Sequence, residues 1–191
     1  MIHHLNGKLI EKSPTALIIE CHGIGYEVKI SLNTFEQIGN DEQIKIYTQF
    51  IVREDAQILY GFHRAEEREM FNLLTSVSGI GPNTAIIMLS SLQPSEIASA
   101  ITNEDVNTIK SVKGIGLKTA QRVIVDLKDK MLKFSVSEEI VTTGNNTIKI
   151  DALTALISLG FDKKMASKAI ERIYKDQGSV ELLIRDALRI L

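Results

Sequence analysis

The segment Ser76-Val-Ser-Gly-Ile-Gly-Pro-Asn-Thr-Ala85 returns 35 residues later as Ser111-Val-Lys-Gly-Ile-Gly-Leu-Lys-Thr-Ala120. Seven of the ten paired positions are identical. Each copy joins two stretches whose apolar residues recur with helical spacing, so the sequence predicts helix, tight glycine turn and helix, twice over. This arrangement is a paired helix-hairpin-helix domain.

The residues of each copy suit an anion that approaches the main chain. Glycine permits positive φ and has no Cβ, so a phosphate oxygen can come close to the backbone. The helix that follows offers unpaired N–H groups and the positive end of its dipole. We therefore predict contacts to the DNA backbone that do not read bases. The predicted residues are Gly79, Ile80, Gly81, Asn83, Thr84, Lys113, Gly114, Ile115, Gly116, Lys118, Thr119 and Arg122, with Ile80 and Ile115 pointing inward to hold the helices together.

Charge is distributed unevenly along a chain whose net charge is only −2. Residues 1–62 sum to −3, residues 63–109 to −4 and residues 134–191 to zero. Residues 110–133 carry seven basic and two acidic side chains, a net charge of +5. The positive charge therefore coincides with the second glycine turn and the helix that it opens, as expected for an element that attracts phosphate.

Several function classes are disfavoured. Neither glycine turn has the third glycine of a dinucleotide-binding fingerprint or the Gly-Lys-Thr of a phosphate loop, so we expect no nucleotide cofactor. The single cysteine, Cys21, cannot form an internal disulfide, and the four histidines show no metal-ligand spacing with it. No apolar run is long enough for a membrane span and no signal-peptide pattern opens the chain, so we expect a cytoplasmic protein.

The flanking segments predict three further parts. Residues 1–62 alternate apolar and polar in several short runs with one short helix near Leu32, which predicts a small β-barrel of the OB type. We expect residues 63–134 to form the paired helix-hairpin-helix domain. Within it, Pro82 and Pro94 suit helix starts, and Asn103 can cap the helix that contains Val106.

Residues 135–150 are polar, small and without periodicity, so we expect a flexible linker. Residues 151–191 predict three short helices, with Asp162 and Ser179 as caps and breaks at Gly160 and Gly178. A module this small is more typical of a docking unit than of a catalytic one. The predicted class is α+β with several domains.

In this order of parts the chain resembles the RuvA family, the junction-binding subunits of the bacterial branch-migration machine. The most specific matches are the two Gly-Ile-Gly turns, the segment Val52-Arg53-Glu54-Asp55-Ala56-Gln57 with Leu59-Tyr60-Gly61-Phe62, and Leu159-Gly160-Phe161. The resemblance implies a homotetramer, or two tetramers around the DNA, that holds four-way (Holliday) junctions flat for recombination and repair. It also implies recruitment of a RuvB-type hexameric ATPase, contact with a RuvC-type resolvase, and no chemistry of the chain's own.

The resemblance gives roles to two further sets of residues. Glu54 and Asp55, which by themselves are ordinary turn residues, correspond to an acidic pin that repels continuous duplex. Leu156, Leu159, Phe161 and Leu188 correspond to an ATPase-docking face on a three-helix bundle like that of ubiquitin-associated domains. They can equally be the core of that module. Relatives commonly carry a basic residue at the positions of Asn83 and Leu117, so the first turn lacks a cation of its own.

Two other functions compete with this interpretation. Paired hairpins also occur in DNA glycosylases, ligases and nuclease subunits, but Asp126 and Asp129 are the only acids soon after the second turn and they lie among lysines. An adaptor that binds linear DNA and a protein partner is the third possibility. Affinities for four-way junction and linear duplex distinguish these three functions.

Overall fold

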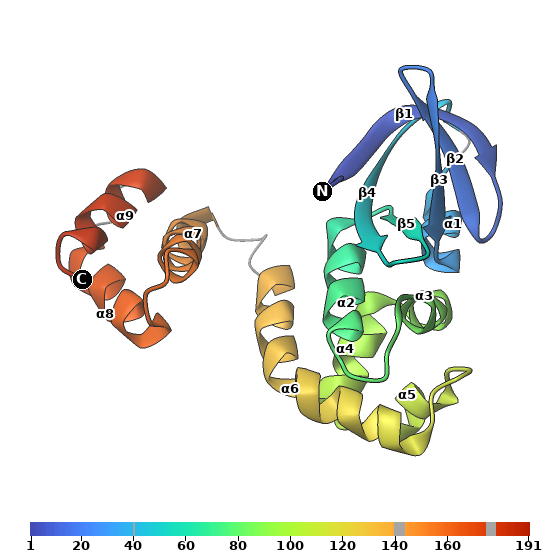
Figure 1. Ribbon diagram of the computed structural model, residues 1–191. Coiled ribbons are helices and arrows are strands. Elements are labelled where there is room, and N and C mark those ends of the chain that lie inside the picture. The colour runs from blue at the N-terminus through green and yellow to red at the C-terminus, as the bar shows by residue number, and fades with distance from the viewer. Residues whose placement is uncertain (40, 140–143, 175–178) are drawn as a thin grey trace. The chain divides into compact units, whose positions relative to one another are not determined.

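The computed structural model describes residues 1–39, 41–139, 144–174 and 179–191. The chain forms two compact units, Met1–Leu132 and Lys133–Leu191. The first contains five strands and the helices of the two glycine turns, and the second contains the C-terminal helices (Figure 1). This confirms the predicted class of barrel, paired hairpins and helical tail.

The first unit opens with a closed five-stranded barrel. Its strands are β1 (His4–Lys12), β2 (Ala16–Cys21), β3 (Ile24–Ile30), β4 (Gln43–Val52) and β5 (Gln57–Phe62), joined in the order β1-β2-β3-β5-β4. Neighbours pair antiparallel except β3 and β5, which are parallel. The short helix α1 (Leu32–Gln37) separates β3 from β4. This topology agrees with the predicted OB type.

Alternation along the strands fills the barrel. Because successive side chains point to opposite faces of a strand, every second residue of β2, Leu17 and Ile19, is fully buried. The interior residues are Leu5, Leu17, Ile19, Val28, Ile30, Ile38, Ile46 and Leu59. Cys21 is half-buried at the margin of this core and its thiol contacts the carbonyl oxygen of Asn6.

Five helices follow the barrel: α2 (Ala65–Thr75), α3 (Pro82–Ser91), α4 (Pro94–Thr102), α5 (Val106–Ser111) and α6 (Leu117–Glu139). Pro82 and Pro94 occupy the first positions of α3 and α4, as the sequence predicts, since proline lacks only an N–H that would have no partner there. The cap of α5 was predicted at Asn103 and is instead Asp105, whose carboxylate accepts from the N–H groups of Asn107 and Thr108. Asn103 ends α4.

A polar joint fixes the barrel to these helices. The side chain of Asn33 in α1 donates to the carbonyl oxygens of Leu89 and Leu92 at the end of α3, at 2.5 and 3.0 Å. The hydroxyls of Ser31 and Thr34 donate to the carboxylate of Glu67, which is only 2% exposed. Beside this network, Phe71 of α2 packs against Tyr60 and Phe62 of β5, with ring centroids 5.1 and 5.0 Å apart.

The second unit contains α7 (Gly144–Ser158), α8 (Lys163–Ile173) and α9 (Val180–Leu188). Asp162 and Ser179 cap α8 and α9 as predicted. Gly160 has φ of +95°, and the following N–H of Phe161 returns to the carbonyl of Leu156, which closes the end of α7. The predicted break at Gly178 lies outside the described residues. Among the residues that the structure describes, no helix is long and apolar enough to cross a membrane.

The linker predicted at residues 135–150 needs a correction. Helix α6 continues to Glu139 and α7 begins at Gly144, so most of that stretch is helical. Residues 117–143 contain neither proline nor glycine. Once a helix is nucleated, each further residue adds a hydrogen bond without a new nucleus, so helix extends through polar sequence that shows no apolar periodicity.

The buried carboxyl of Glu67 makes the stability of the first unit dependent on pH. Burial raises its pKa, although the hydroxyls of Ser31 and Thr34 lower it. Because the pKa in the folded state is the higher one, the protonated carboxyl stabilises the fold at low pH and this contribution is lost as the pH rises through that pKa. Urea unfolding should show the wild type losing stability relative to Glu67→Gln as the pH rises above 4.5, the ordinary pKa of a glutamate, by at most about 1.4 kcal/mol per pH unit.

The matched control is Glu66→Gln, because Glu66 is the exposed neighbour in the first turn of the same helix. Its pH profile should parallel that of the wild type. If the profile of Glu67→Gln also parallels that of the wild type, ionisation of the buried carboxyl does not destabilise the fold.

Candidate nucleic-acid interface

The two glycine turns have the same internal hydrogen bonds. In the first, Ile80 N–H donates to the carbonyl of Val77 and Ala85 N–H to that of Gly81, both at 3.0 Å. In the second, Ile115 donates to Val112 at 3.1 Å and Ala120 to Gly116 at 2.9 Å. The repeat in the sequence is therefore a repeat in structure.

The first and second glycines of each turn meet different requirements. Gly79 and Gly114 have φ of +96° and +91°, in the region that disfavours residues with a Cβ. Gly81 has φ of −84°, which any residue can adopt, and Gly116 is likewise outside the positive range. A Cβ at Gly81 or Gly116 would meet no atom within 4 Å. The fold therefore requires the first glycine, and the missing side chain of the second leaves the backbone open to an outside group.

Helix α3 begins without a side-chain cap. Its N-cap is Gly81, and no side chain caps its first N–H groups with a hydrogen bond. By contrast, Ser31, Asp105, Asp162 and Ser179 cap the helices that they precede. The first N–H groups of α3 remain available, together with the positive end of the helix dipole. Gly116 precedes α6 in the same way and has no side chain with which to cap it.

The predicted side chains divide into an inner and an outer set. Ile80 and Ile115 are 3% and 6% exposed, as predicted for residues that hold the helices together. Asn83, Lys113, Lys118 and Arg122 are exposed, and Thr84 and Thr119 are half-buried. The two turns are neighbours, because a Cβ at Gly79 would lie 3.9 Å from Cγ2 of Thr119. The fold thus brings together two backbone sites that are 35 residues apart in the sequence.

The positive charge is less confined than the sequence suggested. Lys130 of α6 reaches back to the first turn, where its Nζ lies 3.4 Å from Oγ of Ser76. Lys128, two residues earlier, pairs instead with Glu104. Sequence reasoning missed Lys130 because 54 residues separate it from Ser76 and only the packing of α6 brings the two together. The first turn therefore has a cation within reach.

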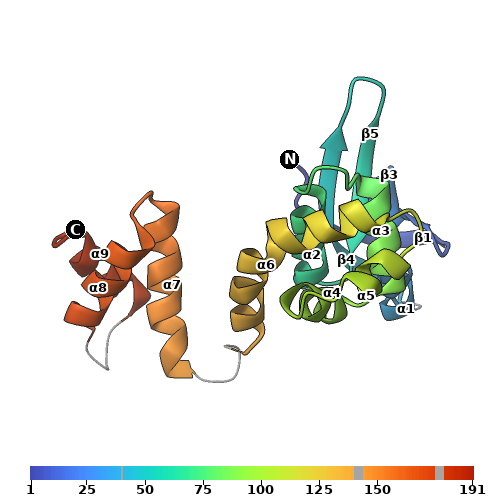
Figure 2. The same cartoon turned by 90° about the horizontal axis from the view of Figure 1, so that it is seen from below.

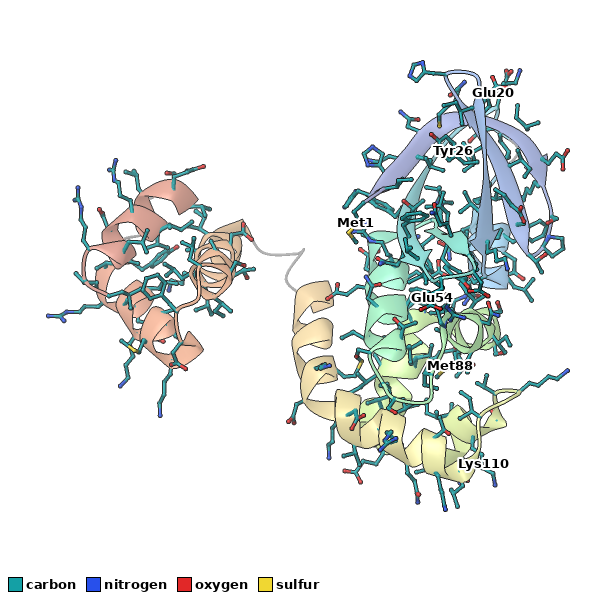
Figure 3. The ribbon with its side chains drawn as sticks, in the orientation of Figure 1. Met1, Glu20, Tyr26, Glu54, Met88 and Lys110 are labelled. Atoms are coloured by element: carbon teal, nitrogen blue, oxygen red, sulfur yellow. The ribbon has the colours of Figure 1, made fainter. Side chains whose placement is uncertain are left out.

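The predicted acids lie at the tip of the β4–β5 hairpin. The N–H of Arg53 donates to the carbonyl of Ala56 at 2.8 Å, which closes the turn around Glu54 and Asp55. Both acids are exposed. The hairpin extends beyond the rest of its unit (Figure 2). Figure 3 shows Glu54 at the end of the barrel nearer the helices and Glu20 at the other end.

Acidic and metal-binding residues do not form another site within the described part of the chain. No group of three or more His, Cys, Asp or Glu side chains there can hold a metal ion. Asp126 and Asp129, which the glycosylase interpretation would require, are exposed on α6.

In the tail the four predicted docking residues differ in how far they are buried. Leu156 is completely buried in the core with Ala152, Ala166 and Ile170, so it is removed from the predicted docking face. Phe161 packs partly against that core. Leu159 and Leu188 are 61% and 42% exposed. Leu156 is buried because it lies four residues after Ala152 on the inner face of α7.

Comparison with family models divides the chain into three parts. Residues 1–61 match the RuvA N-terminal domain, residues 71–129 the SAM-like helix-hairpin-helix tandem, and residues 150–191 the RuvA C-terminal domain.

Full-length relatives carry the same combination. A protein of Christiangramia forsetii is 54% identical over 193 residues, covering 100% of both chains, and one of Flavobacterium psychrophilum is 48% identical with the same coverage. A Coxiella burnetii protein is 38% identical across 99% of this chain and 97% of its own. Each of these relatives is named Holliday junction branch migration complex subunit RuvA. With the barrel, the paired glycine turns and the helical tail in the same order, this chain belongs to the RuvA family.

Proposed function

We propose that the protein is the DNA-binding subunit of a branch-migration complex and binds four-way junctions by shape. The observation that carries this proposal is the pair of adjacent glycine turns, each with an open second glycine, beside a hairpin tipped with two carboxylates. The turns bind phosphates of any sequence, and the carboxylates repel a duplex that runs continuously past them. The names of the relatives support the same function.

The assembly completes this proposal. Four copies around a four-fold axis would bring eight carboxylates to the centre, where the strands of a junction part and a continuous duplex cannot pass. Lys113, Lys118, Arg122 and Lys130 would add the electrostatic attraction, which depends on salt. ATP hydrolysis belongs to a RuvB-type hexamer and strand cleavage to a RuvC-type resolvase. A cytoplasmic location, where the DNA is, accords with these roles.

The competing functions are less well supported. A glycosylase requires a catalytic acid or lysine in a pocket that receives a flipped base, and the two candidate acids are exposed on a helix. An adaptor for linear DNA gives no role to the extended acidic hairpin.

The acidic hairpin provides the experiment that tests the proposed function. In gel-shift titrations the wild type should prefer a four-way junction to a linear duplex of equal length. Glu54→Gln with Asp55→Asn should leave junction affinity unchanged or tighter and raise duplex affinity, because like charge no longer opposes the phosphates. The double variant Glu20→Gln with Glu27→Gln, which removes two exposed acids elsewhere on the barrel, is the charge-matched control. Equal affinity of the wild type for both DNAs would contradict the proposed function.

The two glycine positions predict two different effects. Gly81→Ala and Gly116→Ala should fold normally yet bind all DNA sequences about tenfold more weakly each, through loss of charge-assisted backbone contacts. Gly79→Ala and Gly114→Ala should destabilise the fold by about 1–2 kcal/mol, because alanine is strained at positive φ. Thermal unfolding and titration of two duplexes of unrelated sequence measure both. Loss of affinity for only one of the duplexes would argue against contacts with phosphate alone.

The exposed apolar residues of the tail fit the ATPase partner. Leu159 and Leu188 expose much of their apolar surface to water, which is unfavourable in free energy. A partner that covers them would bury this surface. We include Phe161 in this face, since it is only partly buried.

Leu188→Ser should abolish stimulation of the hexameric ATPase and leave junction binding intact, because the change lies outside the DNA-binding unit. Leu182→Ser is a matched control on the same helix, since Leu182 is 44% exposed and Leu188 is 42% exposed. ATP hydrolysis in the presence of junction DNA is the measurement. Equal loss of stimulation in both variants would mean that Leu188 has no specific part in docking.

A further inference from the structure

One hydrogen bond connects the acidic hairpin to the first glycine turn. Tyr60 lies on β5, one of the two strands of that hairpin, and its hydroxyl donates to Oδ1 of Asn83 at 3.0 Å. Asn83 lies in the first turn of α3, two residues after Gly81. The bond therefore runs from the strand that carries the acids to the helix end that receives phosphate.

The surroundings of this bond are sheltered on the side of Tyr60. The residue is 2% exposed and its ring lies 5.1 Å from that of Phe71. Burial raises the pKa of the hydroxyl, against a smaller lowering by the charge of Arg53 in the hairpin turn. The hydroxyl is therefore a donor throughout the neutral range, and a hydrogen bond in such a setting is stronger than one in water.

Asn83 is suited to hold two partners at once. Its Oδ1 accepts from Tyr60, while the residue itself is exposed. The amide N–H₂ group is on the other side of the same planar group, so it can donate to an outside acceptor such as a phosphate oxygen. A basic residue at this position would supply charge but no acceptor for Tyr60.

Tyr60 lies several residues from the tip of the hairpin, so its hydrogen bond can affect where the two acids lie. Tyr60 pairs with Gln49, and the ladder ends where Val52 pairs with Gln57. At about 3.3 Å per residue, Gln57 is about 10 Å from Tyr60 along the strand, and the acids lie beyond it. A small tilt of the hairpin at Tyr60 becomes a larger displacement of Glu54 and Asp55.

We infer that Tyr60 and Asn83 are positioning residues that hold the acidic hairpin at a fixed place relative to the first phosphate-binding turn, and so set the selectivity for junction over duplex. This inference rests on the proposed function. It gives Asn83 a role that differs from that of a cation: the residue aligns one recognition element with another.

The experiment measures junction and duplex affinities for variants that separate charge from hydrogen bonding. Tyr60→Phe removes only the hydroxyl and should lower the junction-to-duplex ratio about 3- to 10-fold, as expected for one buried hydrogen bond. Asn83→Asp retains the acceptor and adds negative charge, so both affinities should fall together with the ratio preserved. Asn83→Lys removes the acceptor and adds a cation. Both affinities should rise, with a salt slope steeper by about 0.9, while the ratio falls as in Tyr60→Phe.

A second readout distinguishes positioning from a structural role. When the wild type binds a junction with 2-aminopurine next to the crossover, the fluorescence of that base should change. Tyr60→Phe should reduce this change, while circular dichroism shows the same secondary-structure content as in the wild type. Tyr47→Phe is the control, since Tyr47 is on β4 beside Arg68 and should leave ratio and fluorescence unaltered.

Three outcomes of these titrations distinguish the inference from the proposed function on which it rests. A lower ratio in Tyr60→Phe and Asn83→Lys, with the ratio kept in Asn83→Asp, supports the inference. An unchanged ratio in Tyr60→Phe, or an equal drop in Tyr47→Phe, overturns it while the wild-type preference for junctions leaves the proposed function standing. A wild type without junction preference overturns both.

Discussion

The burial of one isoleucine between two glycines organises each glycine turn. Ile80 and Ile115 are only 3% and 6% exposed, so one side of each turn faces the core. The other side is open at the second glycine, where a Cβ would meet no atom within 4 Å. Hydrophobic burial thus prepares a site whose own contacts are polar.

The same logic extends from the turns to the rest of the first unit. The glycine turns and the acidic hairpin can act together, as we propose, only if the distance between them is constant. The joint between α1 and the helices provides that constancy through buried hydrogen bonds made by Asn33 and Glu67, at the energetic cost of burying a carboxyl group. Since Ser31, Asn33 and Thr34 have their partners across the joint, rotation of the barrel against the helices would leave several buried groups unsatisfied.

The C-terminal unit has a core of a different kind. Its core consists largely of small side chains, among them Ala152, Ala166, Ala169 and Ala187. Small residues let the helices approach closely but leave larger apolar residues such as Leu159 and Leu188 on the surface. A module built in this way has a modest core and a substantial apolar exterior, which suits a unit that is covered by a partner.

The sequence by itself determined the elements whose causes are local. Alternation predicted the barrel strands, and the repeat with its glycines and prolines predicted both hairpins, the inward isoleucines and the starts of α3 and α4. These features follow from φ preferences and side-chain periodicity within a few residues. Local reasoning was wrong where elongation of α6 outweighed polar composition, at residues 135–139, and where Asp105 rather than Asn103 capped α5. Only the tertiary structure decided that Lys130 lies at the first turn, that Leu156 is core and that Tyr60 hydrogen-bonds to Asn83. Each of these depends on how whole helices and strands pack across gaps of 23 residues or more, or on which face of a small bundle turns inward, and neither is encoded in any short stretch of the chain.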